Sequence, residues 1–195
     1  MTKNCELIVI GGSWGGLSAV MKILEGLPAQ FAIPIVLVLH RGKHYRSHLD
    51  SLLQAKVAMR VKEAEEKENI LPGHVYLASP NYHLLIEEDH TFSFDLSEPV
   101  HYSRPSIDVT FESVAEVFGS KAAGIILTGA NQDGSAGLQS IAAAGGITLV
   151  QDPAEAESSV MPQAALDKRP SHYVLPLAQI KIFLMQLHSN VRMLN

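Results

Sequence analysis

Continuous apolar runs, separated by a stretch of helical periodicity, dominate the start of the chain. The runs lie at 6–10 and 33–39 and consist mainly of Ile, Val and Leu without polar alternation, which is typical of strands buried on both faces of a parallel sheet. Between them, four apolar residues recur at helical spacing: Leu17, Val20, Met21 and Leu24. The pattern predicts a right-handed β-α-β unit.

The middle of the chain has a different pattern. A helix is predicted at 45–54, followed by a strand at 57–61 and a turn at Pro72-Gly73. Three further short strands are predicted after it: 75–78, 84–87 and 92–96. The acidic tip Glu88-Asp89 separates the last two of these. We interpret this region as an antiparallel hairpin excursion from the parallel sheet.

Helices and strands alternate again in the rest of the chain. An apolar stripe predicts a helix from Ile107 to Phe118. The elements predicted after it are strands at 124–127, 147–150 and 172–175, and helices at 136–144, 162–166 and 177–187. We therefore expect one α/β domain over residues 1–195, doubly wound, with a mostly parallel sheet, helices on both faces and the hairpin excursion. Ligands of such folds bind at the carboxyl ends of the strands.

Composition excludes several classes of protein. Of the 195 residues, 47% are hydrophobic and 18% charged, enough to bury a core. The net charge of -5 argues against nucleic-acid binding, which normally needs a basic stripe. The single cysteine, Cys5, fits a reducing compartment. Because no secretory signal is visible and no apolar stretch approaches the roughly 20 residues that span a membrane, we expect a cytoplasmic protein without membrane insertion.

The glycine-rich segment after the first strand is a candidate nucleophile site. Gly11, Ser13 and Gly15 have the G-x-S-x-G spacing of a nucleophile elbow, a sharp strand-to-helix turn that exposes the serine. Backbone N–H groups at the following helix start could stabilise an oxyanion. The alternative is a glycine turn in which Ser13 caps the helix. A dinucleotide loop does not fit, because Ser13 or Trp14 stands where G-x-G-x-x-G has its middle glycine.

His40 follows the second apolar run, where a histidine suits a general base. Its alternative is a half-exposed histidine with no chemical role. His40, His44 and His48 recur every four residues, a spacing that on one helix could bind a metal. Since His40 is expected to end the strand and no carboxylate or cysteine completes a site, we expect no metal and no organic cofactor.

Asp133 follows the strand predicted at 124–127 and could orient a histidine. Its alternative role is to cap the next helix. Ser13, His40 and Asp133 each follow a predicted parallel strand, so the three side chains are expected to converge at one edge of the sheet. Their order along the chain, Ser–His–Asp, differs from the Ser–Asp–His order of α/β-hydrolases.

Taken together, these segments resemble the catalytic domain of the chemotaxis protein-glutamate methylesterases. Besides His40 at its strand end, six family motifs are matched in order, at 10–16, 71–80, 104–108, 127–135, 145–152 and 161–165. The resemblance implies a hydrolase that releases methanol from glutamate methyl esters on cytoplasmic chemoreceptor helices and in many members also deamidates glutamines. It implies Ser13 as nucleophile, His40 as general base and acid, and Asp133 as orienting carboxylate, without a cofactor.

The chain departs from the family in three respects. Trp14 stands where the family has Thr, and Ala130-Asn131 where it has Met-Gly. These residues are expected to line the substrate and oxyanion site, with Asn131 either a polar donor or, as we favour, a residue in left-handed conformation. Trp14 is either a wall for the substrate helix or a packing residue.

The third departure concerns the receiver domain that usually precedes such esterases, for which residues 1–195 have no segment. We expect any regulation to come from a separate response-regulator protein. The charges of Arg104 and Asp108 also suggest a buried ion pair that shapes the site, with a role toward substrate as the alternative. Two alternatives stay open: an esterase acting on a different protein, and a non-catalytic adaptor of the same family.

Overall fold

Seven parallel strands form the centre of the molecule in the computed structural model, which describes residues 4–40, 49–168 and 173–194. The sheet has the order β3-β4-β2-β1-β7-β8-β9, and each neighbouring pair is parallel. The strands are β1 (Leu7–Gly12), β2 (Ile35–Leu39), β3 (Arg60–Glu63), β4 (His74–Leu77), β7 (Ala122–Ile126), β8 (Ile147–Gln151) and β9 (Tyr173–Leu175). The doubly wound parallel fold expected from the sequence is confirmed.

The strand order reverses next to β1. From β1 the chain passes to β2 on one side and later returns to β7 on the other. The register pairs Gly12 with Leu39 and Gly11 with Ile126, so β1, β2 and β7 end at nearly the same level. This is the topological switch point at which open α/β sheets bind their ligands.

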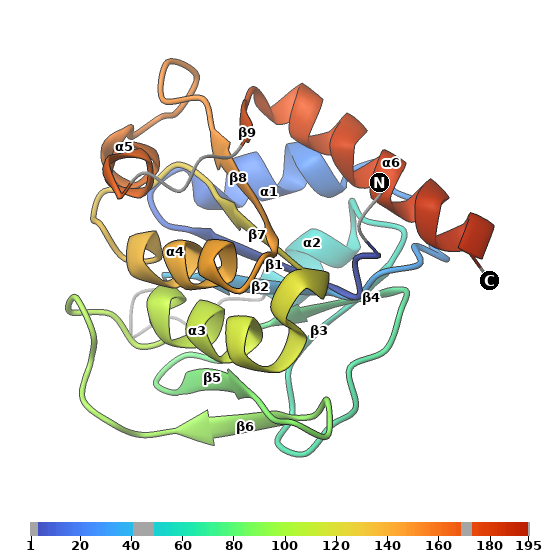
Figure 1. Cartoon of the computed structure of the whole chain (residues 1–195), viewed down its shortest axis with the longest axis horizontal. Helices are drawn as coiled ribbons and strands as arrows, with labels where there is room; N and C mark the ends of the chain where they lie inside the picture. The colour runs from blue at the N-terminus through green and yellow to red at the C-terminus, as the bar shows by residue number, and fades with distance from the viewer. Residues whose placement is uncertain (1–3, 41–48, 169–172, 195) are drawn as a thin grey trace.

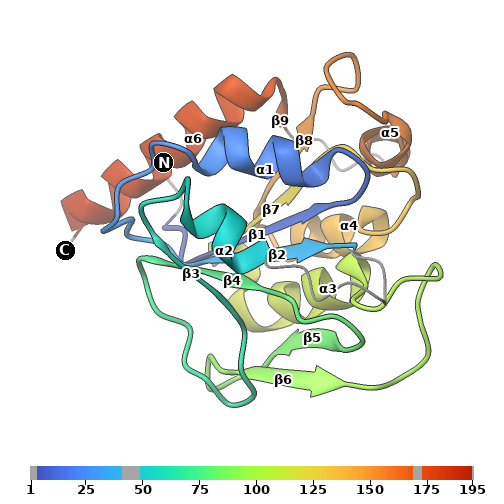
Figure 2. The same cartoon turned by 180° about the vertical axis from the view of Figure 1, so that it is seen from behind.

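Helices cover both faces of the sheet. One face carries α1 (Gly16–Leu24), α2 (Leu49–Gln54) and α6 (Leu177–Leu194), and the other carries α3 (Ile107–Phe118), α4 (Ser135–Ala143) and α5 (Val160–Asp167) (Figures 1 and 2). A short 3-10 turn, η1 (Gly119–Lys121), follows α3. Alternate residues of β1 enter different cores, Ile8 and Ile10 on one face and Leu7 and Val9 on the other. The apolar runs are continuous for this reason.

The excursion is a two-stranded antiparallel hairpin beside α3 (Figure 1). It consists of β5 (His83–Ile86) and β6 (Phe92–Asp95). The strand expected at 75–78 does not belong to it, because β4 pairs in parallel with β2 and β3 in the main sheet. The free edge of β5 is bonded to α3 instead: Thr110 Oγ1 donates to Leu84 O (2.8 Å) and Ile86 N to Ser113 Oγ (3.1 Å).

Most predicted elements are present, with ends shifted by a few residues. The strand expected at 57–61 begins only at Arg60, because Val57 and Met59 pack into the core from the preceding turn rather than from a strand. The first part of the helix expected at 45–54, and residue 172 of the last strand, lie outside the described residues. α2 begins at Leu49.

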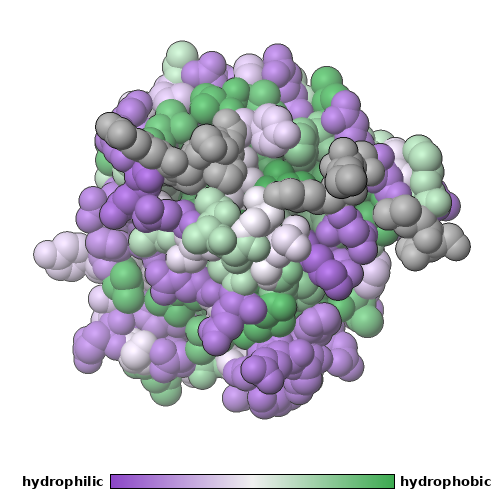
Figure 3. Space-filling view, in the orientation of Figure 1, coloured by the Kyte–Doolittle hydropathy of each residue, from purple (hydrophilic) through white to green (hydrophobic). Residues whose placement is uncertain are grey.

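The surface mixes polar and apolar residues. Figure 3 shows hydrophilic residues spread over one face, with hydrophobic ones in separate patches between them. Within the described part of the chain, no helix has the length and hydropathy needed to cross a membrane.

Candidate functional site

The three candidate residues lie where neighbouring strands end at the switch point. His40 N donates to Gly12 O (3.2 Å), so the ends of β2 and β1 lie side by side. Ser13 N donates to Thr128 O (3.0 Å), which ties the end of β1 to the end of β7. The loop that carries Ser13 therefore lies between the segment of His40 and the β7–α4 loop that carries Asp133.

Ser13 does not cap α1. The N-cap is Gly15, in a left-handed conformation (φ 77°), and no side chain caps this helix start. A Cβ at Gly15 would also lie 2.7 Å from Glu157 Oε2, so both backbone and space favour glycine here. Ser13 is half-buried, and its hydroxyl has no hydrogen-bond partner among the described residues. The hydroxyl thus stays available for chemistry.

Thr128, at the end of β7, holds the Ser13 loop in place. Its amide donates to Gln151 Oε1 at the end of β8 (2.8 Å). Its hydroxyl donates to Trp14 O (3.0 Å) and accepts from Ser158 N (2.8 Å). Thr128 is 2% exposed. Its hydrogen bonds join its own loop to the loop that carries Ser13 and to the segment that carries Ser158.

His40 and Asp133 form a close pair. The distance between His40 Nε2 and Asp133 Oδ2 is 2.7 Å, and the side chains are 12% and 0% exposed. An ionised carboxylate only accepts hydrogen bonds, so it assigns the ring proton to Nε2. In the neutral ring, Nδ1 then carries the lone pair, and Ser103 Oγ lies 3.4 Å from it. The ring has the arrangement of a base oriented by an acid.

Asp133 is held by the start of α3. Besides His40, it accepts hydrogen bonds from Ser106 Oγ (2.8 Å) and from the backbone amides of Ile107 (2.7 Å) and Asp108 (3.0 Å). Burial alone would raise the pKa of Asp133, but the hydrogen bonds from His40, the two amides and Ser106 outweigh it, so its pKa is lowered. The positive end of the helix dipole acts in the same direction. Asp133 is therefore kept ionised.

The alternative role of Asp133 as the N-cap of α4 is wrong. The cap residue of α4 is Gly134, with φ 93°, and it makes no side-chain cap. Ser106 is the N-cap of α3, since its Oγ also accepts from Val109 N.

The expected ion pair between Arg104 and Asp108 is not formed. The Arg104 guanidinium donates to the carbonyls of Leu96 (2.8 Å) and Ser97 (2.9 Å). Asp108 Oδ1 instead accepts from Gly137 N (2.7 Å), the amide of the first turn of α4. Burial raises the pKa of Asp108, and the Gly137 amide opposes this only in part. Asp108 thus links α3 to α4 and is not paired with Arg104.

The residues that depart from the family motifs lie at the rim. The Trp14 side chain is 66% exposed, so it is not a packing residue of the core. Asn131 is not left-handed: its Oδ1 accepts from Asp133 N (3.2 Å), and the left-handed residue of this loop is Gly134. The backbone amides of Trp14 and Ala130 have no hydrogen-bond partner among the described residues. They remain available as donors.

Three residues of the site carried no assignment from the sequence. Ser106 lies in a recognised motif, but no role is assigned to it from the sequence. A serine just before a predicted helix start is a typical N-cap, and this signal could have identified it. Ser103 and Thr128 act through contacts with distant segments, for which the sequence holds no local signal.

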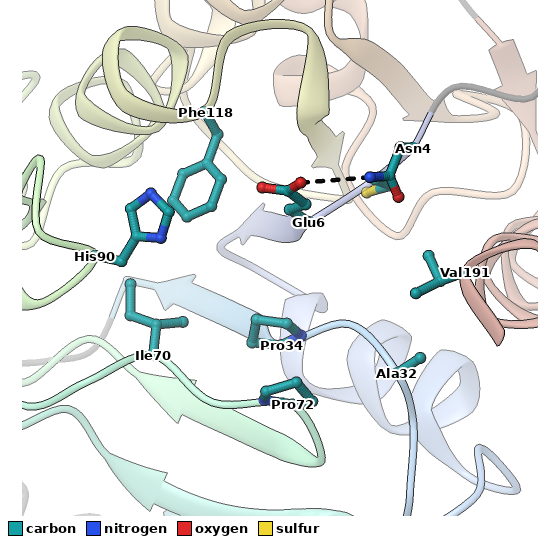
Figure 4. Close-up of a pocket in the computed structure, with 10 residues that line it drawn as sticks. Asn4, Glu6, Ala32, Pro34, Ile70, Pro72, His90, Phe118 and Val191 are labelled. Atoms are coloured by element: carbon teal, nitrogen blue, oxygen red, sulfur yellow. Dashed lines mark hydrogen bonds between the residues drawn. The ribbon is translucent and has the colours of Figure 1, made fainter. Parts of the chain in front are cut away.

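The cavity in Figure 4 lies elsewhere. It measures about 340 Å³ and is lined by residues that precede strands, among them Glu6, Pro34 and Pro72, at the amino ends of β1, β2 and β4. Two of its polar side chains are already partnered: Asn4 Nδ2 donates to Glu6 Oε1 (3.4 Å), and Glu6 pairs with Lys121 (2.9 Å). The opposite edge of the sheet therefore holds the candidate site.

No group of metal-ligating side chains is found within residues 4–40, 49–168 and 173–194. His44 and His48, two of the three histidines with four-residue spacing, lie outside these ranges.

Comparison with known proteins finds a matching family model and a similar solved structure. A family model described as CheB methylesterase matches residues 8–184. The crystal structure of the Thermotoga maritima CheB methylesterase catalytic domain superposes with a TM-score of 0.89 at 32% identity, covering 94% of this chain and 98% of that one.

Relatives of two lengths are similar to the chain. A Leptospira interrogans protein, provisionally named protein-glutamate methylesterase/protein-glutamine glutaminase, is 50% identical over 187 residues, which cover 96% of this chain and 97% of the relative. A Carboxydothermus hydrogenoformans protein-glutamate methylesterase/protein-glutamine glutaminase is 38% identical, with 90% and 53% covered. The methylesterase FrzG of Myxococcus xanthus is 37% identical, with 92% and 54% covered.

Proposed function

Because the chain belongs to the CheB methylesterase family, we propose that it is a serine hydrolase that demethylates glutamate methyl esters on the cytoplasmic helices of a chemoreceptor. The observation that carries the proposal is the 2.7 Å contact between His40 and the buried, ionised Asp133, at the strand end next to the loop of Ser13. A base oriented by an acid beside a serine with an unengaged hydroxyl is the arrangement that acyl transfer requires.

In the proposed mechanism, Ser13 Oγ attacks the ester carbonyl carbon and its proton passes to His40. The receiving atom is Nδ1, because Nε2 is bonded to Asp133. The imidazolium then gives this proton to the departing methoxide, so methanol leaves and a glutamyl ester of Ser13 remains. Water attacks this ester, His40 takes its proton and returns it to Ser13, and free glutamate is released.

The oxyanion of each tetrahedral intermediate needs donors. We assign this role to the backbone amides of Trp14, directly after the nucleophile, and Ala130, in the neighbouring loop. Since backbone groups do this work, the replaced side chains at both positions leave the donors intact. Asn131 lies in the same loop with its Oδ1 bonded to Asp133 N, which leaves its Nδ2 as a further donor. The exposed ring of Trp14 would contact the substrate helix.

The same acyl transfer with ammonia as leaving group would deamidate a glutamine, as the names of two relatives indicate for them. We propose a single catalytic domain over residues 1–195, acting in the cytoplasm where the methylated receptor helices lie. A separate response-regulator protein is the proposed partner for its regulation. The chemistry assigned to Ser13, His40 and Asp133 uses no metal or organic cofactor.

The test is methanol release from a methylated receptor cytoplasmic fragment. Ser13→Ala is expected to reduce the rate at least about 10³-fold, because the nucleophile is lost, while circular dichroism shows an unchanged fold. Ser18→Ala is the matched control, since Ser18 is an exposed serine five positions on in α1, and it should keep the wild-type rate. Methanol release that persists in Ser13→Ala would overturn the proposal.

A fluorophosphonate probe separates this function from the adaptor alternative. Labelling of wild type and Ser18→Ala, but not of Ser13→Ala, would show an activated serine, which an adaptor does not need. Labelling without methanol release from receptor fragments would instead support an esterase that acts on a different protein.

A further inference from the structure

A buried histidine outside the proposed catalytic residues joins the two ends of a loop at the site. His83, the first residue of β5, is 0% exposed. Ser106 N donates to its Nδ1 (3.1 Å), and its Nε2 lies 3.2 Å from Glu98 O. The segment 98–106 between these two contacts carries Ser103, whose hydroxyl lies beside His40 Nδ1. His83 thus closes this loop at its base.

The two contacts fix the state of the ring. Because Nδ1 accepts the Ser106 amide, the ring proton lies on Nε2, which donates to the Glu98 carbonyl. The neutral imidazole satisfies both backbone groups with no water, as a fully buried polar side chain must.

The contact with Ser106 leads directly to the candidate acid. Ser106 Oγ donates to Asp133 Oδ1 (2.8 Å), and the next two amides, of Ile107 and Asp108, also donate to this carboxylate. Asp133 Oδ2 in turn bonds His40 (2.7 Å). A chain of hydrogen bonds therefore runs from His83 through Ser106 and Asp133 to His40.

The remainder of β5 holds the middle of α3. Leu84 O and Ile86 N bond to the side chains of Thr110 and Ser113, one and two turns beyond the helix start. These contacts fix the helix axis but do not reach its first residues. His83 is the only residue of β5 whose described hydrogen bonds reach the start of α3.

We propose that His83 is a positioning residue for the candidate active site, through which the antiparallel hairpin holds the start of α3 and the loop 98–106 so that Asp133 and His40 stay aligned. This role rests on the proposed function. His83 touches neither substrate nor the reacting atoms. Its contribution is geometric, since a displacement of about 1 Å in a supporting group can lower a rate about 10²-fold.

Two substitutions separate its two contacts. In His83→Asn, the amide oxygen lies where Nδ1 lies, so it can still accept from Ser106 N, while the contact with Glu98 is lost. In His83→Gln, the longer amide can still donate to Glu98 O, while Ser106 N loses its acceptor. Each variant gives up one hydrogen bond, so we expect similar losses in Tm.

Their activities are expected to differ. His83→Gln should lower kcat for Ser13-dependent hydrolysis of p-nitrophenyl acetate about 10- to 100-fold, with KM within about twofold, because Asp133 and His40 lose alignment. His83→Asn should stay within about threefold of wild type. Hydrogen–deuterium exchange of the peptide covering 98–112 should lose protection in the Gln variant and keep it in the Asn variant.

His188→Gln is the control for general destabilisation. His188 is also a buried histidine whose Nδ1 accepts a backbone amide, that of Ala32 (2.9 Å), but it lies on α6, away from the site. It should lower Tm and leave kcat unchanged. A loss of kcat in His188→Gln equal to that in His83→Gln, or equal activities and equal exchange in the two His83 variants, would overturn the role of His83.

Hydrogen–deuterium exchange tests the role of His83 independently of the proposed enzymatic activity. If wild type shows no Ser13-dependent hydrolysis, the proposed function fails. Exchange then still decides whether His83 holds the start of α3, and an unchanged peptide 98–112 in His83→Gln would overturn that.

Discussion

The two halves of the candidate site are held in different ways. In the acid–base half, the carboxylate of Asp133 accepts hydrogen bonds from His40, Ser106, Ile107 and Asp108, all between 2.7 and 3.0 Å. In the nucleophile half, only backbone groups of the Ser13 loop are held, through Thr128, and the Ser13 hydroxyl is left unengaged within the described chain. One half is fully ordered before substrate arrives, and the other leaves its reacting group unengaged.

Physical chemistry accounts for the difference. A buried carboxylate must be surrounded by donors to remain ionised, since an unpaired charge in the interior costs several kcal/mol. A nucleophile must instead meet an incoming ester, so hydrogen bonds to its hydroxyl would have to be broken in each turnover. The protein therefore orders the Ser13 loop through Thr128, one step away from the reacting atom.

The largest expected effect comes from the acid–base half. An Asn at position 133 presents its NH2 group either to His40 and Ile107 N or to Ser106 Oγ and Asp108 N, so in each orientation one backbone amide meets a donor instead of an acceptor. We expect Asp133→Asn to lower kcat about 10³- to 10⁴-fold, because His40 loses its tautomer and orientation. The free energy of unfolding should fall by about 2–4 kcal/mol. Ester hydrolysis and urea unfolding measure the two effects.

If Asp133→Asn reduced activity while leaving the free energy of unfolding unchanged, the hydrogen bonds to Asp133 would not be what holds the acid–base half together. Asp133 would then matter to His40 alone, and the start of α3 would not depend on it.

A smaller effect is expected when the support of the nucleophile half is removed. Thr128→Val keeps the shape of the side chain but leaves Ser158 N and Trp14 O without their partner. We expect kcat/KM to fall about tenfold and stability by about 1–2 kcal/mol. Thr128→Ser keeps the hydroxyl and should stay close to wild type. If Val and Ser behave alike in steady-state kinetics, Thr128 does not position the Ser13 loop.

The sequence located the candidate catalytic residues, but not the groups that hold Asp133 in place. Strand ends followed by Ser13, His40 and Asp133 could be located because apolar runs and glycine spacing are local signals. The partners of Asp133 could not, since Ser106 and Asp133 stand 27 positions apart and meet only when α3 packs beside β7. Local propensity even favoured the wrong role for Asp133, a cap on the helix that follows it.

The same limit applies to the fold. The hairpin was expected from its two apolar stretches and acidic tip, but whether 75–78 pairs in parallel with β2 or antiparallel within the excursion depends on the whole sheet. Similarly, the motif around Arg104 and Asp108 suggested an ion pair from charge alone. The structure gives each a backbone partner instead.

Asp108 provides the smallest and sharpest test of the acid–base half. It lies at the same helix start as the donors of Asp133, yet its carboxyl has a raised pKa. Burial and the neighbouring charge of Asp133 outweigh its bond to Gly137 N and the nearby ring of His101, whose Nε2 lies 3.6 Å from Asp108 Oδ2. A carboxyl whose pKa is raised on folding stabilises the folded state below the ordinary pKa of Asp, and this contribution is lost as pH rises through the raised value.

Asp108→Asn should therefore be neutral or slightly stabilising at pH 7, by on the order of 1 kcal/mol or less, because its amide oxygen can still accept from Gly137 N. Below pH 4 the advantage over wild type should vanish, since wild-type Asp108 is then protonated as well. Urea unfolding of both proteins from pH 3.5 to 8 measures this. A variant that is less stable than wild type at pH 7, by more than at pH 3.5, would mean that the Asp108 charge is favoured on folding and that both carboxylates at the start of α3 are held as ions.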